Sequence, residues 1–540
     1  MARLPEPPSN TPSRNVRISA GSRDRNGEGW LRSLAALRTN AIKLAAHVRG
    51  VCASRPQRTG FAAALAIYAV YEGVLRALEL PMVLYWGKMQ LLDRTHLLAH
   101  PLDSLVYLHS QPPVLNALAM VVLHVSNSTG LSETSVASGL FAGLALACFW
   151  ALLRVARLAS GSWIASAACG ALLLLNPAFG FYRYRLLYEI PAMLAVLLTS
   201  WSWLLFVSEG RRLHWIALMF SLALLCATKS LFHPLFALLA ALLALGARQA
   251  VGETGWLDLT RRYAGGFALG MVLVLLWPAK NQLVFDHFVY SSWLGFNLTV
   301  RTPVERYEPF EDFINRGRIH PSLQAQIEAF EGLWAGDDLS IVRELKKPSY
   351  PKIPNWNHLA VLYTSAELER RGIAWRLQHP AEWMRMATGR YFMTMRPSFV
   401  FPYSADTVFS AGPRYDSYAA HYRDIVHPNL RPWFERVVPG WFVHRYAVIL
   451  DQRIPYTPFA FAYPGFLLAC AAFAVRRRRE PIGWFLAYCA FASAWTVFVP
   501  AITDGAEGNR MRLATAPLIC VASVALLQRA AQRLIHKRSA

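Results

Sequence analysis

Charged residues are few in this chain. Only 16% of its 540 residues are Asp, Glu, Lys or Arg, whereas 54% are hydrophobic. A soluble domain carries about a quarter charged residues, so this balance favours a membrane protein over a soluble one. Several apolar runs approach the ~20 residues that a helix needs to cross ~30 Å of hydrocarbon.

Cysteine and lysine are scarce as well. Of the seven cysteines only Cys52 lies outside an apolar run, and residues 281–455, the longest hydrophilic region, contain none. That region therefore has no disulfide framework, even if it faces an oxidising compartment. Only eight of the 55 basic residues are lysine, a bias that favours a GC-rich, bacterial genome.

No cleavable signal peptide is expected either. The first 60 residues are basic and hold no clean apolar core, so the run that begins near Phe61 is expected to target the chain. The formal charge of +22 is uneven: residues 1–60 hold 11 Lys and Arg, while residues 281–455 hold 20 against 18 Asp and Glu. We interpret the excess as the positive charge of cytoplasmic segments rather than as a nucleic-acid site.

Apolar runs predict ten transmembrane helices and hence an all-α polytopic membrane protein. The runs are residues 61–80, 134–154, 163–182, 187–207, 213–228, 232–247, 264–279, 457–475, 481–502 and 512–529. A further apolar run lies in "YLHSQPPVLNALAMVVLHV". Its 13 residues, 113–125, span only about 20 Å as a helix, so we expect it to lie at the outer surface or to re-enter from it.

Loop charges support this count. With the basic N-terminus inside and residues 113–125 not crossing, the inside loops hold most of the arginines, including the run Arg476–Arg479. Counting the extra run as a crossing would move "RRRR" outside, against the positive-inside rule. The first outer loop, residues 81–133, then shares a face with residues 281–455.

These expectations divide the chain into five parts. A basic cytosolic tail with an amphipathic helix at 31–50 occupies residues 1–60, and a transmembrane module with its outer loop occupies 61–280. Residues 281–455 form a mostly helical extracytoplasmic region. Its expected helices are 321–333, 356–372 and 379–394. Residues 456–530 hold the last transmembrane helices, and 531–540 a cytosolic tail.

Carboxylates and cations converge at the outer face under this topology. Carboxylates can accept a proton, and guanidinium or ammonium groups can hold a phosphate, which suits group transfer from a membrane-anchored phosphate donor. Arg183 and Arg185 could equally be headgroup contacts. Lys229 is a stronger candidate because a lone cation is costly within an apolar hairpin. The group is Asp93, Asp103, Arg183, Arg185, Glu189, Lys229, Asp504, Glu507, Arg510 and Arg512.

Two further pairs have a helical spacing of four. His96 and His100 could stack as metal ligands, but two histidines followed by a proline are weak evidence, and no metal or other cofactor is expected. Glu72 and Arg76 lie inside the first crossing, where an internal ion pair that locks a helix contact is the favoured interpretation.

Several segments resemble integral-membrane glycosyltransferases of the GT-C type. They are "QPPVLNALAMVV" at the end of a long outer loop, "NPAFGFYRYRLLYEIPAMLAVLL", "ATKSLFHP", "SSWLGFNL" and "EGNRMRLATAPL". The resemblance covers roughly residues 61–300 and 457–530. It points to the superfamily of the protein O-mannosyltransferases and the aminoarabinose and galacturonic acid transferases of lipid A, and to a bacterial branch of it.

The resemblance implies a polyprenyl-phosphate sugar donor and transfer, usually with inversion, to a lipid, glycan or protein acceptor. The reaction would occur at the periplasmic face of a bacterial inner membrane. Basic residues would hold the lipid phosphate, here Lys229, Arg510, Arg512 and Arg183 or Arg185. Further substrate-site candidates are His109, Gln111, Glu189 and Glu507.

The sequence departs from the family pattern at the general base. In the family, a carboxylate early in the first outer loop usually serves as the general base, yet "PMVLYWGKMQLL" contains no carboxylate. We rank Asp93 first, Asp103 second and Glu79 third. A lipid or glycan transporter and a catalytically inactive membrane partner remain alternatives. The unlike halves of the chain disfavour a transporter, since transporters commonly show two related halves.

Overall fold

The computed structural model describes most of the chain beyond residue 55. The described residues are 56–87, 90–252, 255–300, 302, 304, 306–399, 411–430, 436, 457–503 and 508–539. The amphipathic helix expected at 31–50 lies outside them. The chain forms two compact units, Met1–Ile67 and Tyr68–Ala540, whose boundary falls within helix α2 (Pro56–Ala77). The packing described below is that of the second unit.

Helices make up most of the described structure. The transmembrane-type and outer helices after α2 are α3 (Arg94–Ala99), α4 (Pro101–Val106), α5 (Val114–Thr129), α6 (Glu133–Ser160), α7 (Trp163–Leu174), α8 (Pro177–Arg183), α9 (Glu189–Glu209), α10 (Arg212–Thr228), α11 (Pro234–Gly252) and α12 (Trp256–Phe285). The hydrophilic region and the C-terminal part add α13 (Leu294–Thr299), α14 (Glu308–Glu311), the π-helix η2 (Asp312–Arg316), α15 (Pro321–Leu333), α16 (Ser340–Arg343), α17 (Leu359–Gln378), α18 (Pro380–Thr394), α19 (Pro413–Val426), α22 (Pro458–Arg476), α23 (Pro481–Thr503), α24 (Gly508–Met511), the 3₁₀ helix η3 (Arg512–Thr515) and α25 (Ala516–Ser539).

A single hairpin is the only sheet among the described residues. Strands β1 (Lys346–Lys347) and β2 (Tyr350–Pro354) pair antiparallel, with Lys347 opposite Tyr350. The expected helix 321–333 is confirmed residue for residue as α15, and the expected helices 356–372 and 379–394 correspond to α17 and α18.

Seven described helices are long and apolar enough to cross a membrane, or eight if the bent pair α7 and α8 forms one span. These long apolar helices indicate an all-α, membrane-embedded protein. Nine of the ten predicted runs fall on a helix and 163–182 falls on the bent pair, but α2 and the 17-residue α10 are not among the seven, so the count of ten is not confirmed. Helix α5 has 16 residues, about 24 Å, which is still short for a crossing.

The predicted span 163–182 is broken. Asn176 caps α8 by accepting a hydrogen bond from the Ala178 N–H, and Pro177 occupies the first helical position. Proline suits that position but cannot continue a preceding helix. The two helices therefore meet at an angle of 64°.

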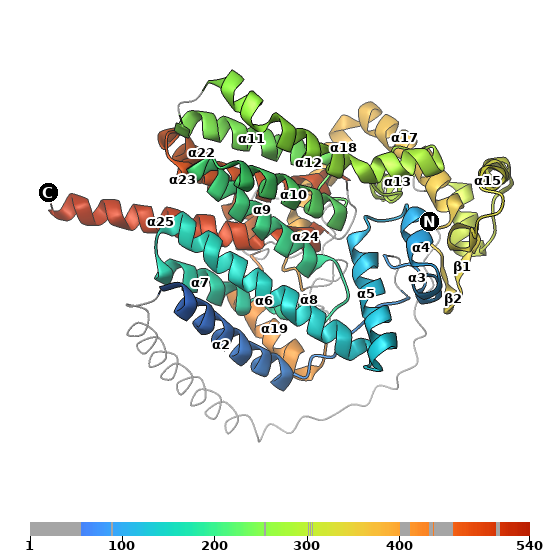
Figure 1. Ribbon diagram of the computed structural model, residues 1–540, viewed down its shortest axis with the longest axis horizontal. Coiled ribbons are helices and arrows are strands. Elements are labelled where there is room, and N and C mark those ends of the chain that lie inside the picture. The colour runs from blue at the N-terminus through green and yellow to red at the C-terminus, as the bar shows by residue number, and fades with distance from the viewer. Residues whose placement is uncertain are drawn as a thin grey trace. The chain divides into compact units, whose positions relative to one another are not determined.

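The long helices pack around α9 (Figure 1), which lies between α6 and α10, while α12 packs on the other side of α10. Helices α9 and α10 are joined only by Gly210 and Arg211. Gly210 has φ +65°, in the left-handed region that glycine adopts without strain, and it ends α9. The tight connection makes the two helices antiparallel, so the start of α9 lies beside the end of α10.

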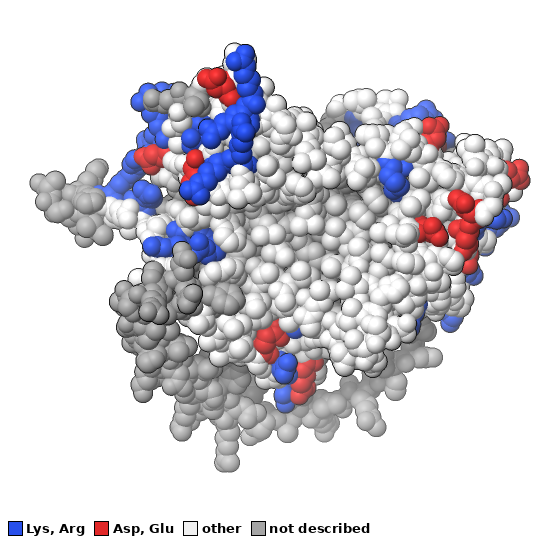
Figure 2. Space-filling view, in the orientation of Figure 1, with Lys and Arg blue, Asp and Glu red and all other residues white. Residues whose placement is uncertain are grey.

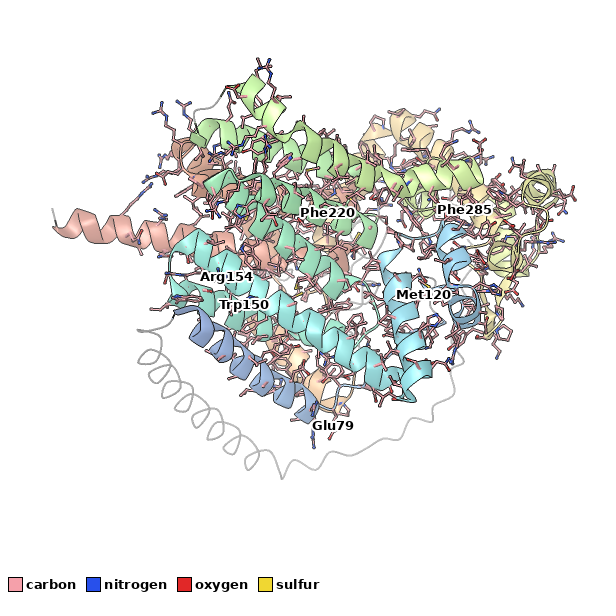
Figure 3. The ribbon with its side chains drawn as sticks, in the orientation of Figure 1. Glu79, Met120, Trp150, Arg154, Phe220 and Phe285 are labelled. Carbon is pink, nitrogen blue, oxygen red and sulfur yellow. The ribbon has the colours of Figure 1, made fainter. Side chains whose placement is uncertain are left out.

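The two ends of the helical bundle differ in charge. On the face drawn in Figure 2, Lys and Arg gather where α11 joins α12, and Arg261 and Arg262 are exposed there. The middle of that face carries almost no charge. Figure 3 shows Arg154 at one end of the bundle and Phe285, the last residue of α12, at the other. The guanidinium carbon of Arg154 lies 5.8 Å from the centroid of the Trp150 ring. This separation agrees with the predicted distribution of inside and outside loops.

The first outer loop packs against the hydrophilic region. Lys347 of the hairpin donates to the carbonyls of Trp86 and Leu91, at 3.1 and 2.5 Å. The Tyr107 hydroxyl donates to Asp337 at 2.5 Å. Residues 81–133 and 281–455 are thus in direct contact, which supports the expectation that they share a face.

Candidate functional site

The end of the bundle opposite Arg154 holds a cluster of buried polar groups around Tyr188. Tyr188 precedes α9, Glu189 is the first residue of that helix, and Lys229 follows the last residue of α10. Because α9 and α10 are antiparallel neighbours, these three residues lie at one end of the pair. Arg510 of α24 reaches the same place from more than 300 residues later in the chain. We call Tyr188, Glu189, Lys229 and Arg510 the Tyr188 cluster.

Two cations approach the Tyr188 ring. The Lys229 ammonium nitrogen lies 4.2 Å from the ring centroid, and the Arg510 guanidinium carbon lies 5.7 Å from it. Arg510 also lies 5.9 Å from the ring centroid of Tyr182. The face of an aromatic ring attracts a cation, so the two tyrosines stabilise positive charge that burial would otherwise make costly.

Glu189 links the cluster through one of its two carboxylate oxygens. Its Oε1 accepts hydrogen bonds from Arg510 Nε and Nη2, at 3.1 and 2.7 Å, while Oε2 is buried without a hydrogen-bond partner among the described residues. The first outer loop reaches the cluster through Gln90, whose amide donates to the Tyr188 hydroxyl at 3.2 Å. The arrangement thus places two cations at one tyrosine ring, next to a carboxylate whose Oε2 has no hydrogen-bond partner among the described residues.

Asp93, the first-ranked base, is held by structural hydrogen bonds. Its carboxylate caps α3 by accepting from the N–H and hydroxyl of Thr95, and it accepts from the N–H and hydroxyl of Ser349 in the β1–β2 turn. Burial alone would raise the pKa of this carboxyl, but the hydrogen bonds from Thr95 and Ser349 outweigh burial and hold the pKa below its usual value. Three of these donors bind Oδ1 and one, the Ser349 N–H, binds Oδ2, so both carboxylate oxygens are engaged in holding the two segments together.

Asp103 and Glu79 lie outside the Tyr188 cluster. Asp103 sits in the first turn of α4, is 51% exposed and lies 3.8 Å from His100. It does not cap that helix, whose N-cap residue is His100. Glu79 has φ +58° and forms an exposed ion pair with Arg414 at 2.8 Å. Figure 3 shows Glu79 at the edge of the molecule, beyond the end of α2.

Arg183 forms a buried ion pair with Glu72. Its Nε and Nη2 donate to the two carboxylate oxygens at 2.9 and 3.1 Å, and Tyr68 also donates to that carboxylate at 2.6 Å. The predicted Glu72–Arg76 pair is therefore wrong, because the carboxylate is taken by an arginine more than 100 residues away. Arg183 serves a helix contact rather than the Tyr188 cluster.

Arg185 joins the first outer loop to the segment before α9. Its Nη1 donates to the carbonyls of Pro81 and Tyr184, at 2.8 and 2.9 Å, and its guanidinium carbon lies 4.4 Å from the Phe181 ring centroid. Val83 and Arg185 form an isolated parallel bridge at the same place. Arg185 thus also holds chain segments together.

His109 is fully buried between the first outer loop and the hydrophilic region. Nε2 lies 2.9 Å from the Asn357 carbonyl, which can only accept, so Nε2 carries the proton and Nδ1 accepts from the Ser292 hydroxyl at 3.0 Å. Burial and the nearby Lys280 lower the pKa of His109 to about 3. Gln111 is partly exposed in the turn before α5. Asp504 and Glu507 lie outside the described residues.

The paired histidines each face a different acid. His96 lies 3.0 Å from Glu344, and His100 lies 3.4 Å from Asp338. Within the part of the chain that the structure describes, no three His, Cys, Asp or Glu side chains gather closely enough to hold a metal ion.

The structure therefore brings together Lys229, Arg510 and Glu189 from the predicted set, and places Arg512 in a separate contact with the Arg396 carbonyl at 3.1 Å. Sequence reasoning missed Tyr188 and Gln90. Tyr188 could have been found from its place directly before Glu189 in "YRYRLLYEIP", where an aromatic ring meets the charged end of a helix.

Comparison with known proteins adds no relative: no family model and no curated protein matches the chain. Function therefore has to be inferred from the residues of the site and from the chemistry they can perform.

Proposed function

We propose that the protein is a membrane glycosyltransferase of the GT-C type with ten membrane-crossing helices. It would work at the periplasmic face of a bacterial inner membrane and use a polyprenyl-phosphate sugar as donor. The observation that carries the proposal is the Tyr188 cluster, in which Lys229 and Arg510 approach one ring beside the carboxylate of Glu189. Lipid, glycan and protein hydroxyls or amines are the acceptors to be tested.

The cations supply the donor-phosphate site. Lys229 is a compact point charge and Arg510 is a guanidinium that Glu189 holds through Nε and Nη2, and both kinds of cation suit phosphate oxygens. In a water-poor site such fixed charges stabilise the negative charge that grows on a leaving phosphate. The aromatic rings of Tyr182 and Tyr188 hold the cations in place before the donor arrives.

Glu189 is the residue to which we assign the acceptor's proton. The acceptor oxygen or nitrogen forms a bond to the anomeric carbon while the bond from that carbon to the phosphate oxygen breaks. The electron pair of the broken bond leaves with polyprenyl phosphate, and the acceptor's proton passes to Oε2 of Glu189. Oε2 has no partner among the described atoms, whereas both oxygens of Asp93 accept hydrogen bonds.

The test is turnover in vesicles reconstituted with the full chain, with polyprenyl-phosphate sugars offered in turn. Glu189→Gln should cut kcat by roughly 10²–10⁴-fold, the usual weight of acid–base catalysis, and leave donor binding intact. Lys229→Gln should weaken donor binding by about tenfold or more, because it removes a charge-assisted hydrogen bond. Lys352→Gln is the matched control, since Lys352 is exposed on β2.

Wild-type turnover in Glu189→Gln would place the base elsewhere, with Asp103 next in order. Unchanged donor affinity in Lys229→Gln would reduce the cluster to a structural contact. The engagement of Asp93 favours a second candidate, a catalytically inactive membrane partner, because the loop carboxylate expected to act as base is used for folding. Absence of turnover with every donor, together with retained donor binding, would support that candidate.

A further inference from the structure

Helix α7 is too short to reach the outer membrane surface. Its first residue, Trp163, lies level with the arginines at the inner end of the bundle, since its ring centroid is 5.3 Å from the Arg157 guanidinium carbon. The 12 residues of α7 rise about 18 Å against ~30 Å of hydrocarbon, and α8 then turns away at 64°. The break therefore lies inside the bilayer, roughly 12 Å below its outer hydrocarbon boundary.

The outward face of α7 is apolar up to this break. Ile164, Leu172 and Leu175 are 75%, 53% and 58% exposed. Exposed apolar side chains that follow one another along a helix mark a surface covered by lipid or protein, and on a membrane helix acyl chains can cover them. The acyl chains thus reach at least as far as Leu175.

Helix α19, which belongs to the hydrophilic region, meets the chain at this break. The Tyr418 hydroxyl donates to the Leu175 carbonyl at 2.5 Å, and the Tyr415 hydroxyl donates to the Pro177 carbonyl at 3.0 Å. A helix end leaves carbonyls without a partner in the helix, and in hydrocarbon water cannot supply one. Figure 1 shows α19 among the long helices, beside α8, while α15 and the hairpin lie at the far end of the molecule.

Both ends of α19 lie at the outer ends of other helices. Arg414 donates to the carbonyl of Ala77, the last residue of α2, at 3.1 Å, and pairs with Glu79 at 2.8 Å. His427, directly after α19, lies 4.8 Å, ring to ring, from Phe459 in the first turn of α22. Helix α19 therefore lies across the outer leaflet, between the end of α7 and the membrane surface.

A second face of α19 is polar and exposed. It consists of Arg414, Ser417, His421 and Asp424, whose spacing of three, four and three residues places them along one side of the helix. We call these four residues the α19 face. Charged and polar side chains are costly against acyl chains, so at this depth the α19 face requires headgroups or water.

Helix α8 connects α19 to the Tyr188 cluster. The rings of Phe181 and Tyr415 have centroids 6.0 Å apart, and the next residue, Tyr182, has the Arg510 guanidinium carbon 5.9 Å from its ring centroid. A headgroup at the α19 face would thus lie one helix away from the cluster.

We propose that the Tyr415 and Tyr418 hydroxyls hold α19 in the outer leaflet, and that the α19 face binds phospholipid headgroups drawn below the level of the surrounding membrane surface. Amphipathic helices with basic and polar side chains bind at this boundary between headgroups and acyl chains. Arg414 is balanced by Glu79 and Asp424 by Arg423, which suits a zwitterionic headgroup. The inference concerns the lipids of the membrane itself and does not rest on the proposed function.

The experiment measures the depth of the α19 face by quenching of a fluorescent label with brominated lipids. The full chain carries one label, at Ser417→Cys or His421→Cys, in vesicles of phosphatidylcholine brominated either near the headgroup or near the chain ends. Leu172→Cys, exposed on α7, is the deep control, and Ala325→Cys, exposed on α15, is the control in water. The described cysteines are buried or partly buried, and the unsubstituted chain gives the labelling background.

Labels at residues 417 and 421 should be quenched by lipids brominated near the headgroup and less by those brominated near the chain ends. The label at residue 172 should show the reverse order, and the label at residue 325 no quenching by either lipid. Labels at 417 and 421 that behave like the one at 325 would place α19 in water and overturn the proposal. The order shown by residue 172 would overturn it as well, because acyl chains would then cover the α19 face.

The double variant Tyr415→Phe/Tyr418→Phe tests the anchors, because it removes both hydroxyls and keeps both rings. Loss of two hydrogen bonds should shift α19 about tenfold or more towards an undocked state, so quenching at residue 421 should fall. Tyr350→Phe, in the β1–β2 hairpin, is the matched control and should change nothing. Unchanged quenching in the folded double variant would overturn the two hydroxyls as anchors. None of these measurements requires turnover, so failure of the proposed function would leave them unaffected.

Discussion

Ser349 donates both its backbone N–H and its hydroxyl to the carboxylate of Asp93, at 2.9 and 2.8 Å, across 256 residues of chain. The same carboxylate caps α3 through Thr95. One side chain therefore sets the start of a helix in the first outer loop and anchors the β1–β2 turn of the hydrophilic region. These contacts give Asp93 a role in folding, and that role can be tested separately from a role in catalysis.

Asp93→Asn should lower stability and leave turnover close to that of the wild type. Asparagine caps a helix about as well as aspartate, but an amide cannot accept at both ends, so a donor of Ser349 loses its partner at a cost of about 1–3 kcal/mol. Thermal midpoint and kcat measured on the same preparation check this. Asp103→Asn, at an exposed position, is the control. A large fall in kcat with an unchanged midpoint would restore Asp93 as the base.

Lys347 should make stability rise with pH in the alkaline range. Burial lowers the pKa of Lys347 from 10.5 to about 8, against the raising effect of Asp93. Between these two values the unfolded chain binds more protons than the folded one, so the free energy of unfolding increases as pH rises. Other groups also titrate in this pH range, so the thermal midpoints of the wild type and of Lys347→Met are compared from pH 8 to 10. An identical pH dependence in both would contradict the assignment.

Arg183→Gln should destabilise the protein strongly because it leaves the Glu72 carboxylate without its counter-charge. Breaking a buried ion pair by removing one partner costs about 3–5 kcal/mol, whereas removing both charges can be nearly neutral. Glu72→Gln combined with Arg183→Gln should therefore recover much of the loss. Chemical or thermal unfolding of the single and double variants measures this. Arg76→Gln, which removes the arginine of the wrongly predicted pair, should have little effect.

A reporter placed after Arg479 and another placed within residues 320–350 should lie on opposite sides of the membrane. The motive is the contact of the hydrophilic region with the first outer loop, together with the arginines gathered at the other end of the bundle. Accessibility of introduced cysteines to a membrane-impermeant reagent in intact cells measures it. Labelling of both positions from the same side would refute the topology.

The class of protein could be predicted from the sequence because burial in hydrocarbon is a local property. A run of about twenty apolar residues suits the membrane wherever it occurs, and arginines mark the inside loops one by one. The same locality predicted α15 to the residue and placed Glu189 and Lys229 together at the expected outer face. The break at Asn176 was missed, because "NP" ends a helix without interrupting the apolar run.

The partner of each buried charge was decided by tertiary structure alone. Spacing along one helix suggested Arg76 for Glu72, yet the carboxylate binds Arg183. Asp93 could be interpreted as a base from its loop position, and only its contact with Ser349 shows that both of its oxygens are engaged. A pattern in the sequence reports which residues share a helix face, but an ion pair or hydrogen bond between residues 100 to 300 positions apart depends on how the helices pack, because a charge interacts with whatever lies within a few ångströms of it.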